Sequence, residues 1–202
     1  MREDCGIAAY RAGRWADALA ELRTARRLTG RGGYLPLMAD CERALGRPDR
    51  ALAIINDPGV RELEREVQIE LRIVESGIRR DEGRPAAAVV ALQVPELTDG
   101  RLRPWSARLF YAYADALLDT GRAEEAQDWF GRAAAADAGE ETDAAERFED
   151  LDTAVFEDLA DLTGDGESGT GDGDGLPGEV GDGQSARREG PQGNPGAGPP
   201  AS

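Results

Sequence analysis

Hydrophobic and small residues recur along the first two thirds of the chain at the spacing of amphipathic helices. Ala18, Leu22 and Ala25 form one apolar stripe at positions i, i+4 and i+7, and Leu19 joins it three residues before Leu22. Aromatic residues make up only 5% of the chain, so the apolar positions are mainly alanine and leucine. Because these residues favour helices over strands, the pattern predicts an all-α fold.

A hexapeptide of the form Gly-Arg-x-x-x-Ala interrupts the stripes four times. Its copies begin at Gly13, Gly46, Gly83 and Gly121, which are 33, 37 and 38 residues apart. Repeats of this length are typical of stacked helical hairpins. The glycine is expected to end one helix with a positive φ, and the alanine to let the next helix pack closely.

Stripes and turn residues together predict four hairpins. Pro48 and Pro85 suit the first position of a helix, whereas Pro58 and Pro95 shorten the second helices of the two middle hairpins. In the first three hairpins, the predicted helices pair Cys5–Arg11 with Asp17–Leu28, Leu35–Leu45 with Pro48–Asn56, and Leu63–Asp81 with Pro85–Leu92. The fourth hairpin pairs a helix that begins at Pro104 with a return helix that contains Ala126 and Ala133.

This pattern of small, large and turn residues resembles the tetratricopeptide repeat over residues 3–137. The matching residues are Tyr113, Ala114, Leu117, Gly121, Ala126, Phe130 and Ala133 in the fourth unit, and Gly6, Gly13, Ala18, Leu22 and Ala25 in the first. The stretches 92–97 and 103–109 resemble those of uncharacterised bacterial proteins of this class. The resemblance implies a right-handed solenoid of about four helix-turn-helix hairpins, whose first helices line a concave groove for a peptide or partner helix.

Carried over by register, the resemblance gives ten candidate partner-binding residues. They are Tyr10, Arg11, Asp40, Arg43, Ile73, Arg80, Asp81, Tyr111, Asp115 and Asp119. Alternating arginine and aspartate would suit a peptide of mixed charge, since arginine grips carboxylates bidentately. The alternative is that these residues are solvated helix faces supported by pairs at i and i+4.

The C-terminal third carries most of the acidity. Of the net charge of −16, residues 137–163 contribute −10 and residues 164–202 contribute −5. We therefore divide the chain into helical repeats at 1–137, an acidic capping helix at 138–163, and a disordered tail rich in Gly, Pro and Asp at 164–202. The apolar stripe of the capping helix consists of Phe148, Leu151, Val155, Leu159 and Leu162.

Three functional hypotheses fit this organisation. The first is a scaffold or adaptor that binds a protein segment in the groove. The second is an acidic effector in which residues 137–202 bind a basic partner surface, and the third is self-association through the N-terminal hairpin. Nucleic acid is not an expected partner because the net charge is negative, and no apolar run approaches the roughly 20 residues that span a membrane.

Catalysis is not expected, because the chain contains neither histidine nor lysine and hence no Ser-His or Cys-His pair. No cofactor or metal is predicted; the stretch Asp161–Gly166 with Asp172 resembles half a calcium loop but lacks its exiting helix. Cys5 and Cys41 are interpreted as two small buried thiols, with a disulfide between them left open. The N-terminus lacks the layout of a signal peptide, which favours the cytoplasm.

Overall fold

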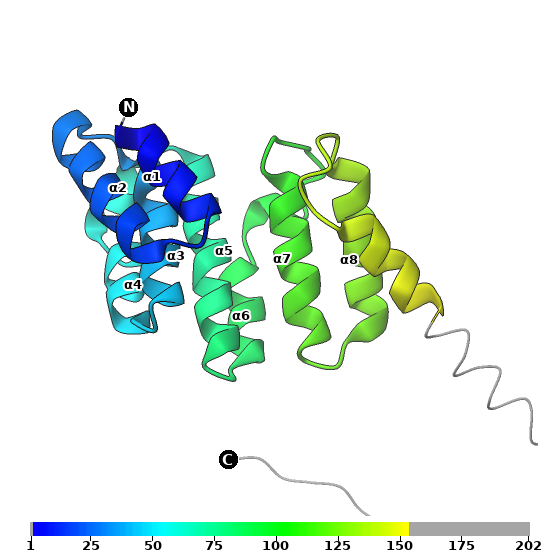
Figure 1. Cartoon of the computed structure of the whole chain (residues 1–202). Helices are drawn as coiled ribbons and strands as arrows, with labels where there is room; N and C mark the ends of the chain where they lie inside the picture. The colour runs from blue at the N-terminus through cyan, green and yellow to red at the C-terminus, as the bar shows by residue number, and fades with distance from the viewer. Residues whose placement is uncertain (1, 154–202) are drawn as a thin grey trace, which may run out of the picture. The chain divides into compact units, whose positions relative to one another are not determined.

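The computed structural model describes residues 2–153, and every regular element in that range is helical (Figure 1). This confirms the predicted all-α class. The α-helices are α1 (Arg2–Arg11), α2 (Trp15–Thr29), α3 (Leu35–Ala44), α4 (Pro48–Ile55), α5 (Arg65–Asp81), α6 (Pro85–Leu92), α7 (Ser106–Leu118) and α8 (Ala123–Ala136). Residues 144–153 are also helical. Short 3-10 turns η1 (Gly32–Tyr34), η2 (Pro58–Glu62) and η3 (Pro95–Leu97) join the longer elements.

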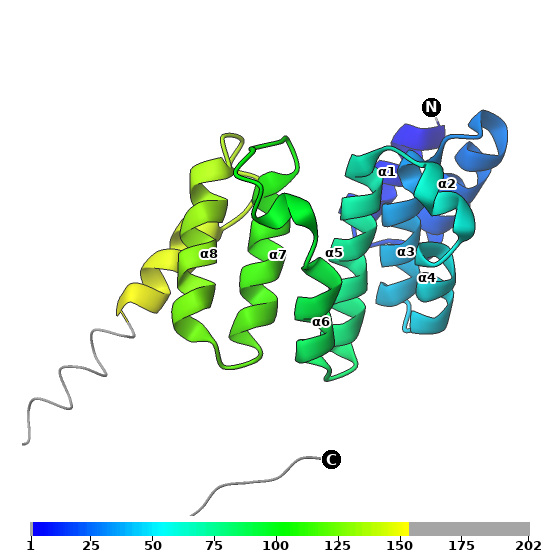
Figure 2. The same cartoon turned by 180° about the vertical axis from the view of Figure 1, so that it is seen from behind.

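The helices pack as consecutive pairs. Each odd-numbered helix packs against the helix that follows it, and α3, α5 and α7 contact one another in sequence (Figures 1 and 2). This arrangement brings residues of the same register, more than 30 positions apart in the chain, onto neighbouring helices.

The repeated hexapeptide forms the same turn in each pair. Its glycines have φ values of 69°, 70°, 69° and 77° at Gly13, Gly46, Gly83 and Gly121. At the second copy, Gly46 N–H donates to the Arg43 carbonyl and Arg47 N–H to the Glu42 carbonyl, both at 2.9 Å. These two bonds define a Schellman cap, and the other three copies repeat them. The alanines at the end of the hexapeptide are all 0% exposed: Ala18, Ala51, Ala88 and Ala126.

Replacing Gly46 with alanine is expected to lower the free energy of unfolding by about 1–2 kcal/mol, the cost of a Cβ at positive φ. Apart from Gly46 itself and the two residues next to it in the chain, no residue has an atom within 4 Å of the position that this Cβ would occupy, so backbone strain is the cause of the loss. Gly33→Ala is the matched control, since Gly33 is equally open but has no positive φ. Urea unfolding measures both variants, and equal stabilities for the two would contradict this account of the turn.

The middle helix pairs have short second helices, as the prolines predict. Helices α4 and α6 each contain 8 residues, whereas α2 contains 15 and α8 contains 14. Pro58 and Pro95 each begin a 3-10 turn. Three predicted starts are wrong by two residues. Helix α2 begins earlier, at Trp15 instead of Asp17, and α7 begins later, at Ser106 instead of Pro104. Helix α5 begins at Arg65 instead of Leu63, because residues 58–62 form the 3-10 turn η2.

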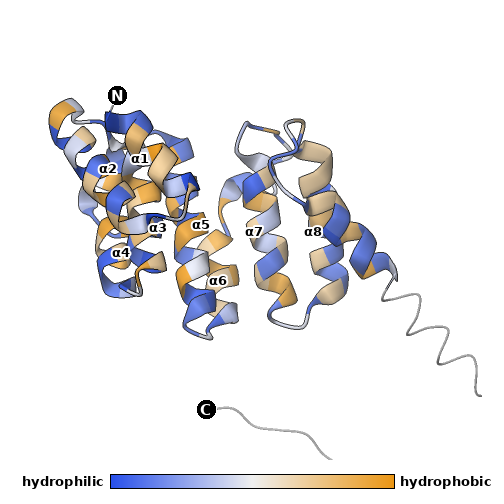
Figure 3. Cartoon of the chain, in the orientation of Figure 1, coloured by the Kyte–Doolittle hydropathy of each residue, from blue (hydrophilic) through white to orange (hydrophobic). Residues whose placement is uncertain are grey.

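Two clusters of buried side chains form the core, one on each side of α5. The first joins α1–α5 around Leu22 and Leu71, and the second joins α5–α8 and residues 144–151 around Leu109 and Phe130. Apolar positions occur along each of the labelled α-helices (Figure 3), and buried ones among them form most of these two clusters. Helix α5 therefore contributes to both clusters and to the surface between α3 and α7.

One of the two cysteines has its predicted environment and the other does not. Cys41 is buried, and burial raises the pKa of its thiol to about 11. Cys5 is exposed, so its interpretation as a buried thiol is wrong. The reason is helical register: Gly6 and Ala9 are the residues of α1 that are buried, and Cys5 lies just outside the arc between them, about 40° beyond Ala9 and about 100° from Gly6. Both thiols are free.

The C-terminal predictions are described only in part. Within the proposed capping segment, Ala144 is buried and Leu151 packs against the second core cluster. The end of that segment, the tail at 164–202 and the half calcium loop at Asp161–Gly166 with Asp172 lie outside the described residues. Within residues 2–153, no helix is long and apolar enough to span a bilayer.

Candidate functional site

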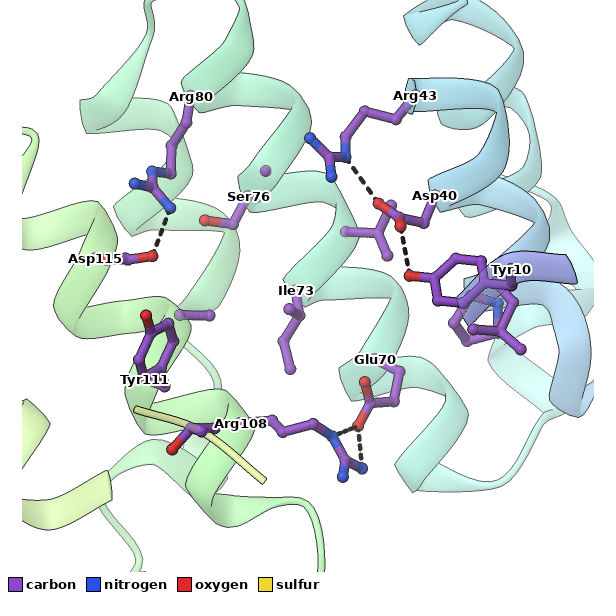
Figure 4. A pocket seen from close by; sticks show the side chains of 16 residues that line it. Tyr10, Asp40, Arg43, Glu70, Ile73, Ser76, Arg80, Arg108, Tyr111 and Asp115 are labelled. Atoms are coloured by element: carbon purple, nitrogen blue, oxygen red, sulfur yellow. Dashed lines mark hydrogen bonds and ion pairs between the residues drawn. The ribbon is translucent and has the colours of Figure 1, made fainter. Parts of the chain in front are cut away.

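A groove of about 350 Å³ lies over α3, α5 and α7 (Figure 4). Seven of the ten residues selected from the sequence line it: Tyr10, Asp40, Arg43, Ile73, Arg80, Tyr111 and Asp115. Asp81 and Asp119 are exposed and bond to lining arginines, which places them at its edge. Arg11 is elsewhere, in a shallow depression beside Asp4 and Ala12.

Helix α5 supplies the middle of the groove because Glu70, Ile73, Gly77 and Arg80 recur at i, i+3, i+7 and i+10 on one face. Apolar side chains flank Ile73 on both sides: Pro36 and Leu37 from α3, and Tyr111 and Ala112 from α7. A Cβ added at Gly77 would lie 3.5 Å from Arg43 Nε, an ordinary contact distance, so the Arg43 side chain lies close against this part of α5.

Arg43 on α3 and Arg80 on α5 each bond two carboxylates, and one ion pair of each arginine corresponds by register: Arg43 with Asp81 and Arg80 with Asp119. Arg43 donates to Asp40 on its own helix at 2.8 Å and to Asp81 on α5 at 2.7 Å. Arg80 lies 37 residues later and donates to Asp115 at 2.9 Å and to Asp119, which follows α7, at 2.5 Å. Each arginine is therefore held between two carboxylates, at least one of which belongs to the next helix pair.

A third arginine closes one end of the groove. Arg108 on α7 donates to Glu70 on α5 at 2.6 Å and to Glu141, which precedes the last described helix, at 2.5 Å. From that helix Arg147 donates to Asp115 at 3.1 Å, and its guanidinium lies 4.8 Å from the centre of the Phe130 ring. The helix of residues 144–153 is thus joined to the charged wall.

Two tyrosines place neutral hydroxyl groups in the groove. Tyr10 donates to Asp40 at 2.6 Å, and burial together with this bond raises the pKa of the phenol above its usual range. Burial, followed by a hydrogen bond with Asp143, raises the pKa of Tyr111 to about 12. Both phenols therefore remain protonated at neutral pH and act as hydrogen-bond donors.

Ser76 lines the same groove and has an unusual environment. It is 1% exposed, and its hydroxyl is the one buried side-chain polar atom of residues 2–153 that lacks a hydrogen-bond partner. Its oxygen extends from α5 toward the α7 side, where Arg80 and Tyr111 are found (Figure 4). An unsatisfied buried hydroxyl costs about 1–3 kcal/mol, so it marks a position where a polar ligand atom would be stabilising.

Sequence reasoning missed Ser76, Glu70 and Arg108. The stripe of α5 contained enough information to find Glu70, which precedes Ile73 by three residues. Arg108 could not be found in this way, because its role depends on which helix its long side chain reaches. Ser76 required knowledge of every neighbour that leaves its hydroxyl without a partner.

Within the described part of the chain, no group of three or more His, Cys, Asp or Glu residues is placed to hold a metal ion. The groove offers hydrogen-bond donors and acceptors, ion pairs and an apolar floor. Comparison of the chain with protein-family models, with characterised proteins and with solved structures gave no significant match.

Proposed function

We propose that the chain is a non-catalytic, tetratricopeptide-like scaffold that binds a peptide or partner helix in the groove. The observation that carries the proposal is the groove itself, because residues of the same register on α3, α5 and α7 line it. An apolar floor with regularly spaced polar side chains along its edges suits a ligand whose own side chains repeat.

Support for the repeat architecture comes from the turns. Four copies of one hexapeptide form the same Schellman cap and bury the same alanine, so successive hairpins enter their second helices in the same way. We propose that these hairpins stack as a right-handed solenoid of about four units, closed by the acidic helix. In such an array the first helices lie side by side and offer a continuous surface.

Selection of random peptides of about 16 residues on the full chain tests the scaffold function. Ala112→Gln places a bulky neutral side chain in the groove, and we expect selected peptides to bind this variant at least about tenfold more weakly. Val90→Gln is the control, since Val90 is 65% exposed on α6 and does not line the groove. Circular dichroism would verify that both variants fold, and peptides bound equally by both would refute the proposal.

The acidic effector remains the second candidate because Glu146, Glu149 and Asp150 are exposed on the helix of residues 144–153. These carboxylates are available to a basic partner surface. A chain that ends after residue 163 and carries Glu146→Gln, Glu149→Gln and Asp150→Asn separates the two functions, because it lacks both the tail and these exposed carboxylates. The scaffold predicts that selected peptides still bind this variant, whereas loss of their binding would favour the effector.

A further inference from the structure

We infer that the groove selects a cationic segment, in which an arginine or lysine adjoins an aliphatic side chain. This inference rests on the proposed scaffold function and specifies the chemistry of its partner. It differs from the mixed-charge peptide expected from the sequence, because the structure reveals how the arginines of the groove are already engaged.

The first argument is that the groove arginines have partners. Arg43 and Arg80 each use two nitrogen atoms on carboxylates, and Arg108 uses all three of its guanidinium nitrogens. The N–H groups that Arg43 and Arg80 keep free lie beside the two carboxylates that each arginine already bonds. An anionic ligand that approached them would be repelled by these carboxylates, so it gains little from the arginines.

The second argument is an excess of acceptors. Arg43, Arg80 and Arg108 each lie between two carboxylates, so each of these three clusters carries one negative charge. Asp143, beside Tyr111, adds another, and Arg147 offsets one. A carboxylate has about four acceptor positions, of which Asp81 and Asp119 each use one for these arginines.

These two aspartates are also accessible. The Asp81 side chain is 56% exposed and the Asp119 side chain is 39% exposed, so a ligand ammonium or guanidinium group can reach their remaining lone pairs. They follow their arginines by 38 and 39 residues along the chain. Corresponding carboxylates therefore occur at the ends of successive helices, as a segment with spaced cationic residues requires.

The third argument concerns the floor. Ile73 and its neighbours offer an apolar contact, and the buried Ser76 hydroxyl lacks a partner. A hydroxyl both donates and accepts, so a peptide N–H or C=O would satisfy it, whereas a purely aliphatic ligand would not. The complementary ligand is thus a polypeptide segment with an aliphatic residue for the floor and a cation for the edge.

The test uses the peptides that the full chain selects and that Ala112→Gln fails to bind, synthesised with acetylated and amidated ends. We expect these peptides to be net positive, with arginine or lysine next to Leu, Ile or Val. The double variant Asp81→Asn, Asp119→Asn should weaken their binding at least about tenfold, and added salt should weaken binding to the unmodified chain.

The matched control removes the same charge elsewhere. Glu124→Gln with Asp128→Asn alters two exposed carboxylates of α8 that do not line the groove, and affinity should stay within about twofold. Groove-dependent peptides that are neutral or acidic, or that tolerate loss of both Asp81 and Asp119, would overturn the inference and leave the scaffold function intact. Failure to select any groove-dependent peptide would instead overturn the scaffold function, and the inference with it.

Discussion

Replacing Phe130 with alanine is expected to lower the free energy of unfolding by about 3–5 kcal/mol. Phe130 is 0% exposed and belongs to the core cluster that joins α7, α8 and residues 144–151. The variant loses the transfer free energy of the ring and leaves a cavity that surrounding helices fill only in part. Since domains are stable by about 5–15 kcal/mol in total, this single change removes a large fraction of the stability.

The same substitution should loosen one wall of the groove. The centre of the Phe130 ring lies 5.3 Å from that of Tyr111 in an edge-to-face arrangement, and Arg147 lies over its face. Without the ring, Tyr111 and Arg147 lose the contact that fixes their positions. We therefore expect the variant to exchange amide hydrogens faster than the unmodified chain, and this increase should be larger in residues 144–153 than in α3, which belongs to the other core cluster.

Urea unfolding followed by circular dichroism measures the loss. Phe130→Leu keeps an apolar side chain and should cost less than Phe130→Ala. Leu28→Ala is the surface control, because Leu28 is 73% exposed and its removal should change stability by no more than about 0.5 kcal/mol. Similar losses for Phe130→Ala and Leu28→Ala would mean that α8 does not pack as described.

The features that the sequence predicted well are local ones. The left-handed glycine, the proline at the start of a helix and the small residue five positions after the glycine each act within one turn, so the repeat identified them. The helix Pro85–Leu92 has the predicted ends, because Pro85 fixes its start and the residues after Leu92 lead into a proline.

The pairing of charges could not be predicted in the same way. Asp40 and Arg43 suggested support within one helix, and that contact exists at 2.8 Å. The contacts from Arg43 to Asp81 and from Arg80 to Asp119 join residues 38 and 39 positions apart, and they depend on the stacking distance and on the rotamers of long side chains. Register placed these residues on neighbouring helices, but only the structure determines which carboxylate each guanidinium bonds.

Removing the two arginines that surround Glu42 is expected to destabilise the protein more than removing Glu42 itself. Glu42 on α3 is 0% exposed, and its carboxylate accepts bonds from Arg23 of α2 and, at 3.5 Å, from Arg47 of the second hexapeptide. Arg23→Met with Arg47→Met would leave a buried carboxylate without a cation. Breaking a buried pair in this way costs about 3–5 kcal/mol.

Replacing Glu42 while keeping both arginines is expected to have a smaller effect on stability. The Arg23 and Arg47 side chains are 48% and 46% exposed, so water can solvate both guanidinium groups when the carboxylate is absent. Glu42→Leu also places an apolar side chain among buried residues, and we expect it to cost less than about 1.5 kcal/mol. The buried carboxylate of Glu42 therefore needs the two arginines to neutralise it, whereas the arginines can be solvated by water when Glu42 is absent.

A triple variant completes the test. Adding Glu42→Leu to the Arg23→Met, Arg47→Met pair should recover most of the lost stability, because no buried charge then remains at this site. Urea unfolding of the four proteins at neutral pH gives the coupling between the carboxylate and its cations. If the triple variant is as unstable as the arginine double variant, the loss comes from packing of the arginine side chains and not from the stranded carboxylate. In the predicted outcome, Arg47 of the repeated hexapeptide has a structural role that the repeat alone did not indicate, since it neutralises a buried acid between the first two helix pairs.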